Sequence, residues 1–408
     1  MGNDGILSGL RVIDCGTYIA GPASATIMSD FGAEVFKIER PGSGDLFRLF
    51  PHLPGTAKSE LNWGWVLTSR NKKSVALNLS VPDGREVLLR LVRTADVFVT
   101  NYQRVILEQF RLTWDDLRAE NPRLIYAHIT GYGDSGDDAD APAYDALAYW
   151  ARSGLMMSVV GNDGTPGRPR PGMGDHPTAM SLFAAIMLGL YRRELTGRGS
   201  KVGTSLMASG AWANGCDLQA RFCNAVFPES GSGGAKHPPN PLAAGYFSHD
   251  GKAFMIALLD PVHEFPRLCE ALGHPDLATN SMFADDAGRI ENAAALYALL
   301  QSQFESRNLA EWRPLFLRHD IKWSAFPLLE EAASDPQMRE AGAIIDMEYP
   351  GHGRIPTVNS PIFVAGVDKR TPAAAPAIGA HTREVLCQLG YDDQMIEDFL
   401  RRGVAATA

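Results

Sequence analysis

The segment GMGDHPTAM (172–180) places an aspartate and a histidine between glycines and a proline, directly ahead of a long apolar run. An acid before a proline and a helix is a common N-cap arrangement, so one interpretation makes Asp175 a helix cap. A helix N-terminus also keeps a carboxylate ionised and offers N–H groups to an oxyanion, so the second interpretation makes Asp175 a nucleophile. His176 serves at most as a helper, because no third group accompanies it. Local sequence favours the cap and leaves both interpretations open.

Positive charges gather near predicted strand ends, where they would suit phosphate groups. Arg40 ends the segment EVFKIER, and SRNKKS (69–74) adds three further cations. Charge-assisted contacts to phosphate favour these residue types, although a solvated loop explains them equally well. The first strand-to-helix turn, CGTYIAGP (15–22), lacks the glycines of a dinucleotide fingerprint, because Tyr18 and its bulky neighbours crowd the backbone. A nicotinamide dehydrogenase is therefore disfavoured.

Composition argues against several classes of protein. The net charge of −9 provides no global positive field for nucleic acid or an anionic membrane surface. The five cysteines are scattered without a CxxC motif, so we expect neither a disulfide framework nor a metal site, and a reducing cytoplasm fits best. Cys15 ends an apolar strand and is interpreted as a core residue. The N-terminus lacks a secretory pattern, and the longest apolar stretch (179–191) is too short to span a bilayer.

The elements that must position Asp175 alternate between β-rich runs and helices. We predict strands over 10–16, 34–40, 96–101 and 123–130, and helices over 21–32, 83–95 and 113–121. Such alternation indicates a parallel sheet covered by helices on both faces. Beyond a long loop (131–145), we predict a helix over 146–157, a second over 177–195, and a strand over 200–207 that enters a helix running to about residue 225.

The composition changes at FPESGSGGAKHPPNP (227–241), which we interpret as a domain boundary. The following segment, AGYFSHDGKAFMIAL (244–258), alternates around an Asp-Gly turn as a hairpin should. Helices are predicted over 296–306 and 309–319. These features predict a second, smaller α+β domain, followed by a Gly/Pro-rich β stretch and two short C-terminal helices.

Taken together, the motifs resemble the class III (CaiB/BaiF-like) CoA-transferases, the family of formyl-CoA transferase and carnitine CoA-transferase, with α-methylacyl-CoA racemase as a relative. The matching stretches are LSGLRVIDCGTYIAGPASATIMSDFGAEVFKIERPGSGD (7–45), RNKKSVALNL (70–79), ITGYG with PAYD (129–145), GD with its helix and TGRG (174–199), and IGAHTREVLCQLGY (378–391). They span nearly the whole chain in the family's order.

The resemblance implies an α/β fold in two domains. A Rossmann-like large domain that binds CoA would comprise residues 1–226 and 330–408, and a small α+β domain would comprise residues 227–329. The family forms interlocked dimers, so we expect either a homodimer or a heterodimer with a paralogous subunit. The implied ligands are acyl-CoA and small carboxylic acids, with coenzyme A as substrate and no tightly bound cofactor.

The resemblance also implies the residues of the site. Asp175 matches the family's catalytic aspartate, and Tyr144 with Asp145 match the Tyr–acid pair beside it. The residues implied to bind CoA are Tyr18, Ile19, Ala20, Arg40, Asn71, Lys72, Lys73, Gln109 and Phe110. The last two stand where formyl-CoA transferase has an Arg–Met pair. A glycine-rich lid is implied at Gly231, Gly233 and Gly234, within SGSGG (230–234).

The implied chemistry is attack of Asp175 on a donor thioester, giving a mixed anhydride and then aspartyl-CoA, with nearby backbone N–H groups stabilising the oxyanions. We expect succinyl-CoA as donor and a bulky, aryl-bearing acceptor of the benzylsuccinate or phenyllactate type, because AYWARSGLMM follows the Tyr–acid pair. A racemase remains the alternative, although its family has a histidine where this chain has Tyr144; His128 or His176 would have to substitute. A non-catalytic acyl-CoA binding module is disfavoured.

Overall fold

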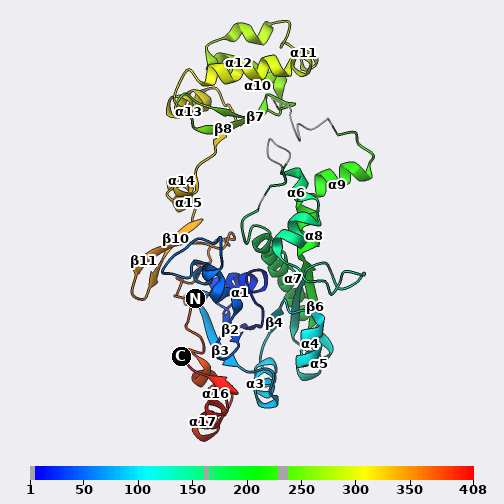
Figure 1. Cartoon of the computed structure of the whole chain (residues 1–408), viewed down its shortest axis with the longest axis vertical. Helices are drawn as coiled ribbons and strands as arrows, with labels where there is room; N and C mark the ends of the chain where they lie inside the picture. The colour runs from blue at the N-terminus through cyan, green and yellow to red at the C-terminus, as the bar shows by residue number, and fades with distance from the viewer. Residues whose placement is uncertain (1–4, 160–164, 168, 228–237) are drawn as a thin grey trace. The chain divides into compact units, whose positions relative to one another are not determined.

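We describe the protein from a computed structural model, which covers residues 5–159, 165–167, 169–227 and 238–408 of the chain. The chain folds into two compact units, drawn in Figure 1. The larger unit comprises Met1–Ser158, Arg168–Gln219 and Arg339–Ala408, and the smaller comprises Val159–Gly167 and Ala220–Met338. The candidate site lies entirely within the larger unit.

The larger unit is built on one seven-stranded sheet with the strand order β12-β3-β2-β1-β4-β5-β6. Every neighbouring pair is parallel except β12 and β3, which are antiparallel. The strands are β1 (Arg11–Asp14), β2 (Glu34–Glu39), β3 (Lys72–Leu77), β4 (Val97–Thr100), β5 (Ile125–Thr130), β6 (Ser200–Ser205) and β12 (Ala405–Ala406). Together with the helices this confirms the predicted α/β class. The strand β3 was not predicted, because its first half reads as a polar, basic loop.

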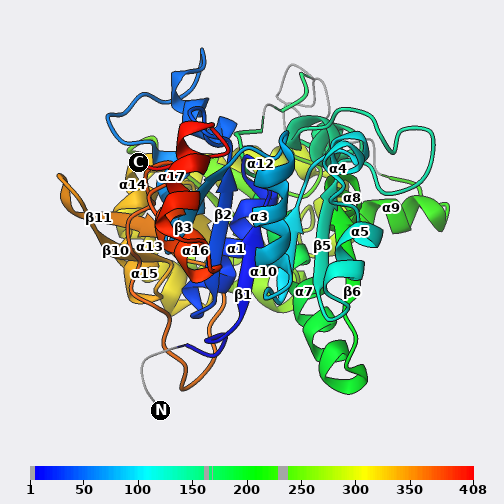
Figure 2. The same cartoon turned by 90° about the horizontal axis from the view of Figure 1, so that it is seen from below.

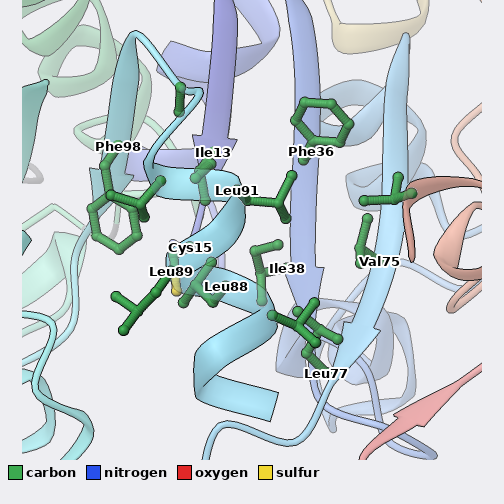
Figure 3. Close-up of a cluster of buried hydrophobic side chains, with 14 of the residues drawn as sticks. Ile13, Cys15, Phe36, Ile38, Val75, Leu77, Leu88, Leu89, Leu91 and Phe98 are labelled. Carbon is green, nitrogen blue, oxygen red and sulfur yellow. The ribbon is translucent and has the colours of Figure 1, made fainter. Parts of the chain in front are cut away.

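Alternate side chains of these strands point to opposite faces of the sheet, and each face has its own core. One face carries Val12, Val35, Val99 and Ile129 against α1 (Ala20–Asp30) and α7 (Asp175–Thr196). The other face carries Ile13, Phe36, Val75 and Phe98, which Figure 3 shows packed against α3 (Pro82–Val92). Helices α16 (Thr382–Gln388) and α17 (Asp393–Arg401) cover this second face too, in front of the strands in Figure 2. The sheet is thus buried on both sides, which explains its apolar strands.

Shorter elements connect these layers. Every residue of helix α1 is buried and most are small, so the helix packs closely against α7. The remaining elements of the larger unit are η1 (Leu46–His52), α2 (Trp63–Ser69), α4 (Arg104–Phe110), α5 (Trp114–Glu120), η2 (Ala146–Ala151), α6 (Leu155–Ser158), α8 (Leu206–Ala213), β10 (Ile344–Tyr349) and β11 (Gly353–Val358). The boundary between the units falls inside α9 (Gly215–Phe222) and α15 (Pro336–Glu340).

The smaller unit pairs an antiparallel three-stranded sheet with helices. Its strands are β7 (Ala243–Phe247), β8 (Ala253–Ala257) and β9 (Trp323–Ala325), and its helical elements are α10 (Pro261–Leu272), η3 (Pro275–Thr279), α11 (Asp286–Glu291), α12 (Ala293–Phe304), α13 (Leu309–Arg318) and α14 (Leu329–Ala333). The predicted hairpin is confirmed, since β7 and β8 pair antiparallel around Gly251. Aromatic side chains, including Phe254, Phe304 and Trp312, form its core.

Two predicted helices are broken in the structure. The helix predicted over 146–157 is the single-turn π-helix η2 followed by α6, and Gly154 between them has a φ of 86° that a right-handed helix cannot accommodate. The helix predicted to run to about residue 225 ends first at Ala213, and α9 begins after Asn214. In both places apolar periodicity continues across the break, so the sequence pattern hides it.

Candidate active site

Helix α7 begins at Asp175, but Asp175 is not its cap. The N-cap is Gly174, and no side chain of the α7 segment itself caps the helix. The capping oxygen comes instead from Asp145, whose Oδ2 accepts hydrogen bonds from the N–H groups of Gly174 at 2.9 Å and Asp175 at 3.3 Å. The predicted cap role of Asp175 is therefore wrong. A distant carboxylate satisfies the helix and leaves the carboxylate of Asp175 available.

The two aspartates consequently form an acidic pair at one helix terminus. Asp145 directly precedes the π-helix η2, an element often found at functional sites. Among the described residues, the Oδ1 atom of Asp145 is buried without a hydrogen-bond partner. Within the same part of the chain, no hydrogen bond or ion pair engages the half-buried carboxylate of Asp175. In the part of the chain that the structure describes, neither carboxylate has a cation bonded to it, which is unusual for buried carboxylates.

This arrangement raises the pKa of both carboxyl groups. Burial, reinforced by the negative charge of Asp145, raises the pKa of Asp175 from 3.8 to about 7. Burial likewise raises the pKa of Asp145, although the N–H groups of Gly174, Asp175 and Gly172 act in the opposite direction. Two like charges at one site resist joint ionisation, so the pair titrates as a unit. A carboxylate whose pKa is shifted by burial and by a neighbouring like charge is typical of a functional site.

The backbone around Asp175 is tightly packed. A Cβ atom on Gly174 would lie 2.3 Å from Oδ1 of Asp145 and 2.4 Å from the ring of Tyr149. Gly172 has a φ of 86°, and a Cβ atom there would contact His176 at 3.3 Å and Ile19 at 3.4 Å. The glycines of GMGD are thus required by close approach and by backbone conformation. They allow Asp145 to reach the start of α7.

The N–H groups expected to stabilise oxyanions are already engaged. Those of Gly174 and Asp175 bond to Asp145, and that of His176 bonds to the carbonyl of Gly172 at 3.0 Å. The next residue, Pro177, has no N–H. The oxyanion role predicted for these backbone groups is therefore not available in this arrangement.

Tyr144 and Tyr18 meet beside the acidic pair. Their rings contact edge to face, with centroids 6.0 Å apart and an interplanar angle of 84°. Burial, together with Tyr144, raises the pKa of Tyr18. Tyr18 has a φ of 60°, a left-handed conformation that is rare for an aromatic residue. The first strand-to-helix turn therefore lies against the predicted catalytic residues.

The residues that follow Tyr18 start helix α1. Ile19 is its N-cap and is buried with Phe47, Trp65 and Ala179 in a small apolar cluster, while Ala20 is the first helical residue and is also buried. The ring of Phe47 also contacts Tyr18, with centroids 6.2 Å apart. Because Ala179 belongs to α7, Ile19 links the turn directly to the helix that begins at Asp175. The structure thus brings Tyr18, Ile19 and Ala20 together with the acidic pair.

The basic residues predicted to bind CoA do not lie together at one edge of the sheet. Arg40 is exposed just beyond the carboxyl end of β2. Lys73 lies opposite Phe36 near the start of β2, four residues back along the strand from Arg40, which amounts to about 13 Å. Ligands of parallel sheets bind outside the carboxyl ends of the strands, so Arg40 lies at the expected edge and Lys73 does not.

Residues 71–73 also have structural partners of their own. Lys72 is fully buried, and its Nζ lies 2.8 Å from Asp14 and 2.7 Å from the carbonyl of Pro22. Lys73 pairs with Glu34 at 2.8 Å and with Glu384 at 2.7 Å. Asn71 exchanges hydrogen bonds with the backbone of Ala373. A buried or doubly paired ammonium is less available to a phosphate, and the Asn71 side chain is already bonded to the backbone. The nucleotide contacts of Asn71, Lys72 and Lys73 therefore stay a prediction that these partners do not favour.

Sequence reasoning missed a residue at the correct edge. Asn101 follows the carboxyl end of β4, and its side chain donates to the carbonyl of Thr17 and accepts from the N–H of Thr17, both at 2.8 Å. The segment DVFVTN does contain the signal, since a polar residue directly after a buried strand lies at the ligand-binding edge. Gln109 is exposed and Phe110 packs on the core beneath α4.

Four further observations concern predictions made from the sequence. The predicted lid glycines Gly231, Gly233 and Gly234 lie outside the described residues. Within the described ranges, no cluster of three or more His, Cys, Asp or Glu side chains could hold a metal ion. The same part of the chain contains no helix that is long and apolar enough to cross a membrane. His128 has Nε2 3.0 Å from the carbonyl of Tyr102 and a ring contact with Tyr126, as expected for a core histidine.

Comparison with known families decides the identity of the fold. The sequence profile of CoA-transferase family III matches residues 7–382. The chain belongs to CoA-transferase family III. Cinnamoyl-CoA:phenyllactate CoA-transferase from Clostridium sporogenes is 30% identical over 97% of this chain and 96% of its own length. Human succinyl-CoA:glutarate CoA-transferase is 30% identical over 99% of this chain and 91% of its own length.

Solved structures agree with this assignment. A CAIB/BAIF family protein from Brucella suis superposes with a TM-score of 0.81 and 26% sequence identity, covering 95% of this chain and 100% of the other. Membership of family III confirms the resemblance seen in the motifs and makes the chain an enzyme that transfers CoA. The acidic pair of Asp145 and Asp175 is the candidate centre of that chemistry.

Proposed function

We propose that this CoA-transferase moves CoA from an acyl-CoA thioester to a carboxylic acid, with Asp175 as the nucleophile. One observation carries the proposal: Asp145 caps helix α7 in place of Asp175, so the Asp175 carboxylate is left without a bonded partner in the described structure. Its pKa of about 7 keeps a substantial fraction ionised at neutral pH. A carboxylate with such a pKa is also a stronger nucleophile than an ordinary one.

The reaction proceeds in four balanced steps. An oxygen of Asp175 attacks the thioester carbonyl, the C–S bond breaks, and a mixed anhydride and CoA thiolate form. The thiolate then attacks the Asp175 carbonyl of the anhydride, releasing the donor acid as its carboxylate and leaving aspartyl-CoA. In the third step the acceptor carboxylate attacks this thioester, which gives a new anhydride and releases the CoA thiolate. In the fourth step the thiolate attacks the acceptor's carbonyl in that anhydride, which yields the product acyl-CoA and restores Asp175. No net proton, electron or cofactor is consumed.

A bulky, aryl-bearing acid is the acceptor that we propose. Apolar side chains are exposed on the segments beside the acidic pair: Tyr144 at 62%, Leu147 at 51% and Met173 at 51%. Tyr144 adjoins Asp145 in sequence, and Met173 lies two residues before Asp175. Exposed aromatic and flexible apolar groups next to a reactive centre suit a hydrophobic ligand. The similarity to a phenyllactate CoA-transferase supports the same acceptor class. Succinyl-CoA is the proposed donor, supported by the relative that uses succinyl-CoA and glutarate.

Trapping of the acylated aspartate tests the proposed mechanism. The protein is incubated with succinyl-CoA or cinnamoyl-CoA, quenched with hydroxylamine and mapped by peptide mass spectrometry. We expect the hydroxamate at Asp175 in the wild type and its absence in Asp175→Asn, whose turnover should fall by about 1,000-fold or more. Asp116→Asn, which alters a capping box on α5, is the matched control and should be acylated normally. Normal turnover in Asp175→Asn would overturn the proposal.

The same incubation separates the alternatives. In D2O, exchange of an α-proton of the acyl group without transfer of CoA to an added acid would indicate a racemase, whose two acid–base groups would then be sought at Asp145 and His176. Binding of acyl-CoA with neither reaction would indicate a binding module. A panel of phenyllactate, benzylsuccinate, glutarate and oxalate ranks the acceptors. Preference for oxalate over both aryl acids would contradict the proposed acceptor class.

We further propose that the enzyme works as a dimer. Leu188, Tyr191 and Leu195 are each at least 66% exposed along α7, and Trp212 on α8 is 88% exposed. The three α7 side chains lie on one face of the helix by their spacing, and such exposed apolar groups suit burial against a second subunit. Sedimentation of the full chain should give a mass near twice 44.2 kDa. A monomer that dimerises only with a paralogous chain would instead indicate a heterodimer.

A further inference from the structure

The turn that carries Tyr18 is held by a buried ion pair that has no role in the steps above. Lys37, on β2, has a fully buried side chain, and its Nζ lies 2.7 Å from Oδ2 of Asp45. The same ammonium donates a hydrogen bond to the carbonyl of Gly16 at 2.5 Å. Burying an ammonium is unfavourable unless its partners are fixed, so this pair anchors whatever it contacts.

Asp45 relays this anchor to the turn. Its Oδ1 accepts hydrogen bonds from the hydroxyl of Thr17 at 2.9 Å and from the N–H of Tyr18 at 3.1 Å. It also accepts from the N–H of Phe47 at 2.9 Å, so Asp45 is the cap of η1 as well. The Asp45 carboxylate therefore contacts Lys37, the turn and the backbone of Phe47, the residue whose ring packs on Tyr18.

The turn has no conformational freedom left. The N–H of Gly16 bonds to Asp14, its carbonyl to Lys37, and both backbone groups of Thr17 to Asn101. Every backbone donor and acceptor of Gly16 and Thr17 is thus fixed, and the following residue is held at a φ of 60°. A tyrosine in the left-handed region is strained and persists only when its surroundings impose it.

We propose that the buried Lys37–Asp45 pair is a positioning device for the reaction. By imposing the left-handed conformation on Tyr18, it sets the Tyr18 ring against Tyr144 beside the Asp145–Asp175 pair. Lys37 and Asp45 are positioning residues, because their side chains are buried and contact the turn rather than a substrate. This inference rests on the proposed function, since its effect is measured through turnover of acyl-CoA.

The first test is the near-isosteric variant Asp45→Asn. An amide oxygen can still accept from Tyr18, but the amide no longer attracts the Lys37 ammonium, so the turn relaxes. Misplacement of a reacting group by about 1 Å lowers turnover by about 100-fold, and we expect kcat to fall about 10- to 100-fold. The KM for acyl-CoA should change by less than about threefold, because the ring that relaxes is the one that contacts Tyr144 beside the acidic pair.

A matched control is Asp96→Asn, which removes a partly buried ion pair with Arg193 at 2.9 Å. Asp96 precedes β4, at the edge of the sheet opposite the turn, so its loss should lower thermal stability without changing kcat. Equal losses of kcat in both variants would indicate a general stability effect and overturn the inference. Should Asp45→Asn fail to fold, Thr17→Val removes only the hydroxyl donor to Asp45, and we expect a smaller loss of kcat with unchanged folding.

A double-mutant cycle tests whether the pair acts through Tyr18. Glycine adopts a positive φ without strain, so Tyr18→Gly keeps the turn and removes the ring. We expect Asp45→Asn to lower kcat no more than about twofold in the Tyr18→Gly background. Multiplicative losses would overturn the positioning role while leaving Asp175 acylation intact. Absence of acylation in the wild type would overturn the proposed function itself, and with it this inference.

Discussion

The larger unit holds two groups of charged residues in its interior, and it treats them in opposite ways. In the paired cluster of Asp14, Lys37, Asp45 and Lys72, each charge contacts at least one of opposite sign, at 2.7, 2.8 and 3.7 Å. In the acidic pair of Asp145 and Asp175, two like charges share a helix terminus, bonded only to backbone N–H groups of residues near Asp175 or to nothing described. Compensation is typical of a structural group, and the lack of a bonded cation among the described residues is what the proposed reactivity of the second group rests on.

The pKa values express this difference. Burial alone would raise the pKa of Asp14, but the charges of Lys37 and Lys72 outweigh it and hold that pKa below its ordinary value. At Asp175 burial acts in the same direction and the nearest charge, on Asp145, adds to it. Burial raises the pKa at both carboxylates, although Asp14 is fully buried and Asp175 only partly, so the charge of the neighbour decides the sign of the shift. In the proposed mechanism, the lack of a bonded cation among the described residues is thus the feature that prepares Asp175 for nucleophilic attack.

The largest expected effect comes from breaking the paired cluster. Asp14→Asn leaves Lys72 and Lys37 without this counter-charge, so we expect the free energy of unfolding to fall by about 3–5 kcal/mol. Chemical denaturation at pH 7 measures the loss. The control is Asp134→Asn, which removes an exposed pair with Lys201 and should cost less than about 1 kcal/mol. Equal losses in the two variants would contradict the structural role of the cluster.

A second variant sharpens the comparison at the acidic pair. Gly174→Ala places a methyl group 2.3 Å from Oδ1 of Asp145, so Asp145 must move away from the start of α7. Overpacking of this kind costs about 1–3 kcal/mol, and the loss of the cap should also lower acylation of Asp175. Gly215→Ala is the control, because a Cβ there meets nothing within 4 Å. Unchanged stability in Gly174→Ala would show that the close contact does not exist in solution.

Replacing Asp175 should raise the free energy of unfolding, whereas replacing Asp14 should lower it. The folded protein holds the Asp175 proton up to a pKa of about 7, whereas the unfolded chain releases it near 3.8. Stability is therefore lost as pH rises through this window, and Asp175→Asn should relieve that loss. We expect a gain of about 2 kcal/mol at pH 8, discounted for partial solvation, and none at pH 4. If Asp175→Asn were less stable than the wild type at pH 8, the ionised Asp175 carboxylate would have a stabilising partner, which would contradict this account.

Much of the fold could be predicted from the sequence, because it follows from local pattern. The alternation of apolar strands and helices predicted the parallel sheet, and the Asp-Gly turn predicted the β7–β8 hairpin. The strand β3 escaped because its first residues are polar and pair with distant carboxylates such as Glu34 and Asp14. Buried ion pairs look like a solvated loop until the partners are known.

The residues of the candidate site were predicted from the sequence, but the hydrogen bonds that hold them in place were not. Asp175 was identified with Tyr144 and Asp145 from motifs, yet the sequence could not reveal that Asp145, 30 residues away, would cap α7. Capping is a local rule only when the cap belongs to the same segment. Strand register is likewise hidden in the sequence: Arg40 and Lys73 were both expected near strand ends, but the register of β2 and β3 separates them.

The pKa of Asp175 in the free enzyme tests the central claim most directly. Infrared difference spectra between the wild type and Asp175→Asn, recorded from pH 4 to 9, isolate the carbonyl band of the protonated carboxyl group. We predict that this band disappears with a midpoint near pH 7. In the Asp145→Asn background, which removes the like charge, the midpoint should move to lower pH. A midpoint near 4 in both backgrounds would contradict the account, because Asp175 would then be an ordinary carboxylate.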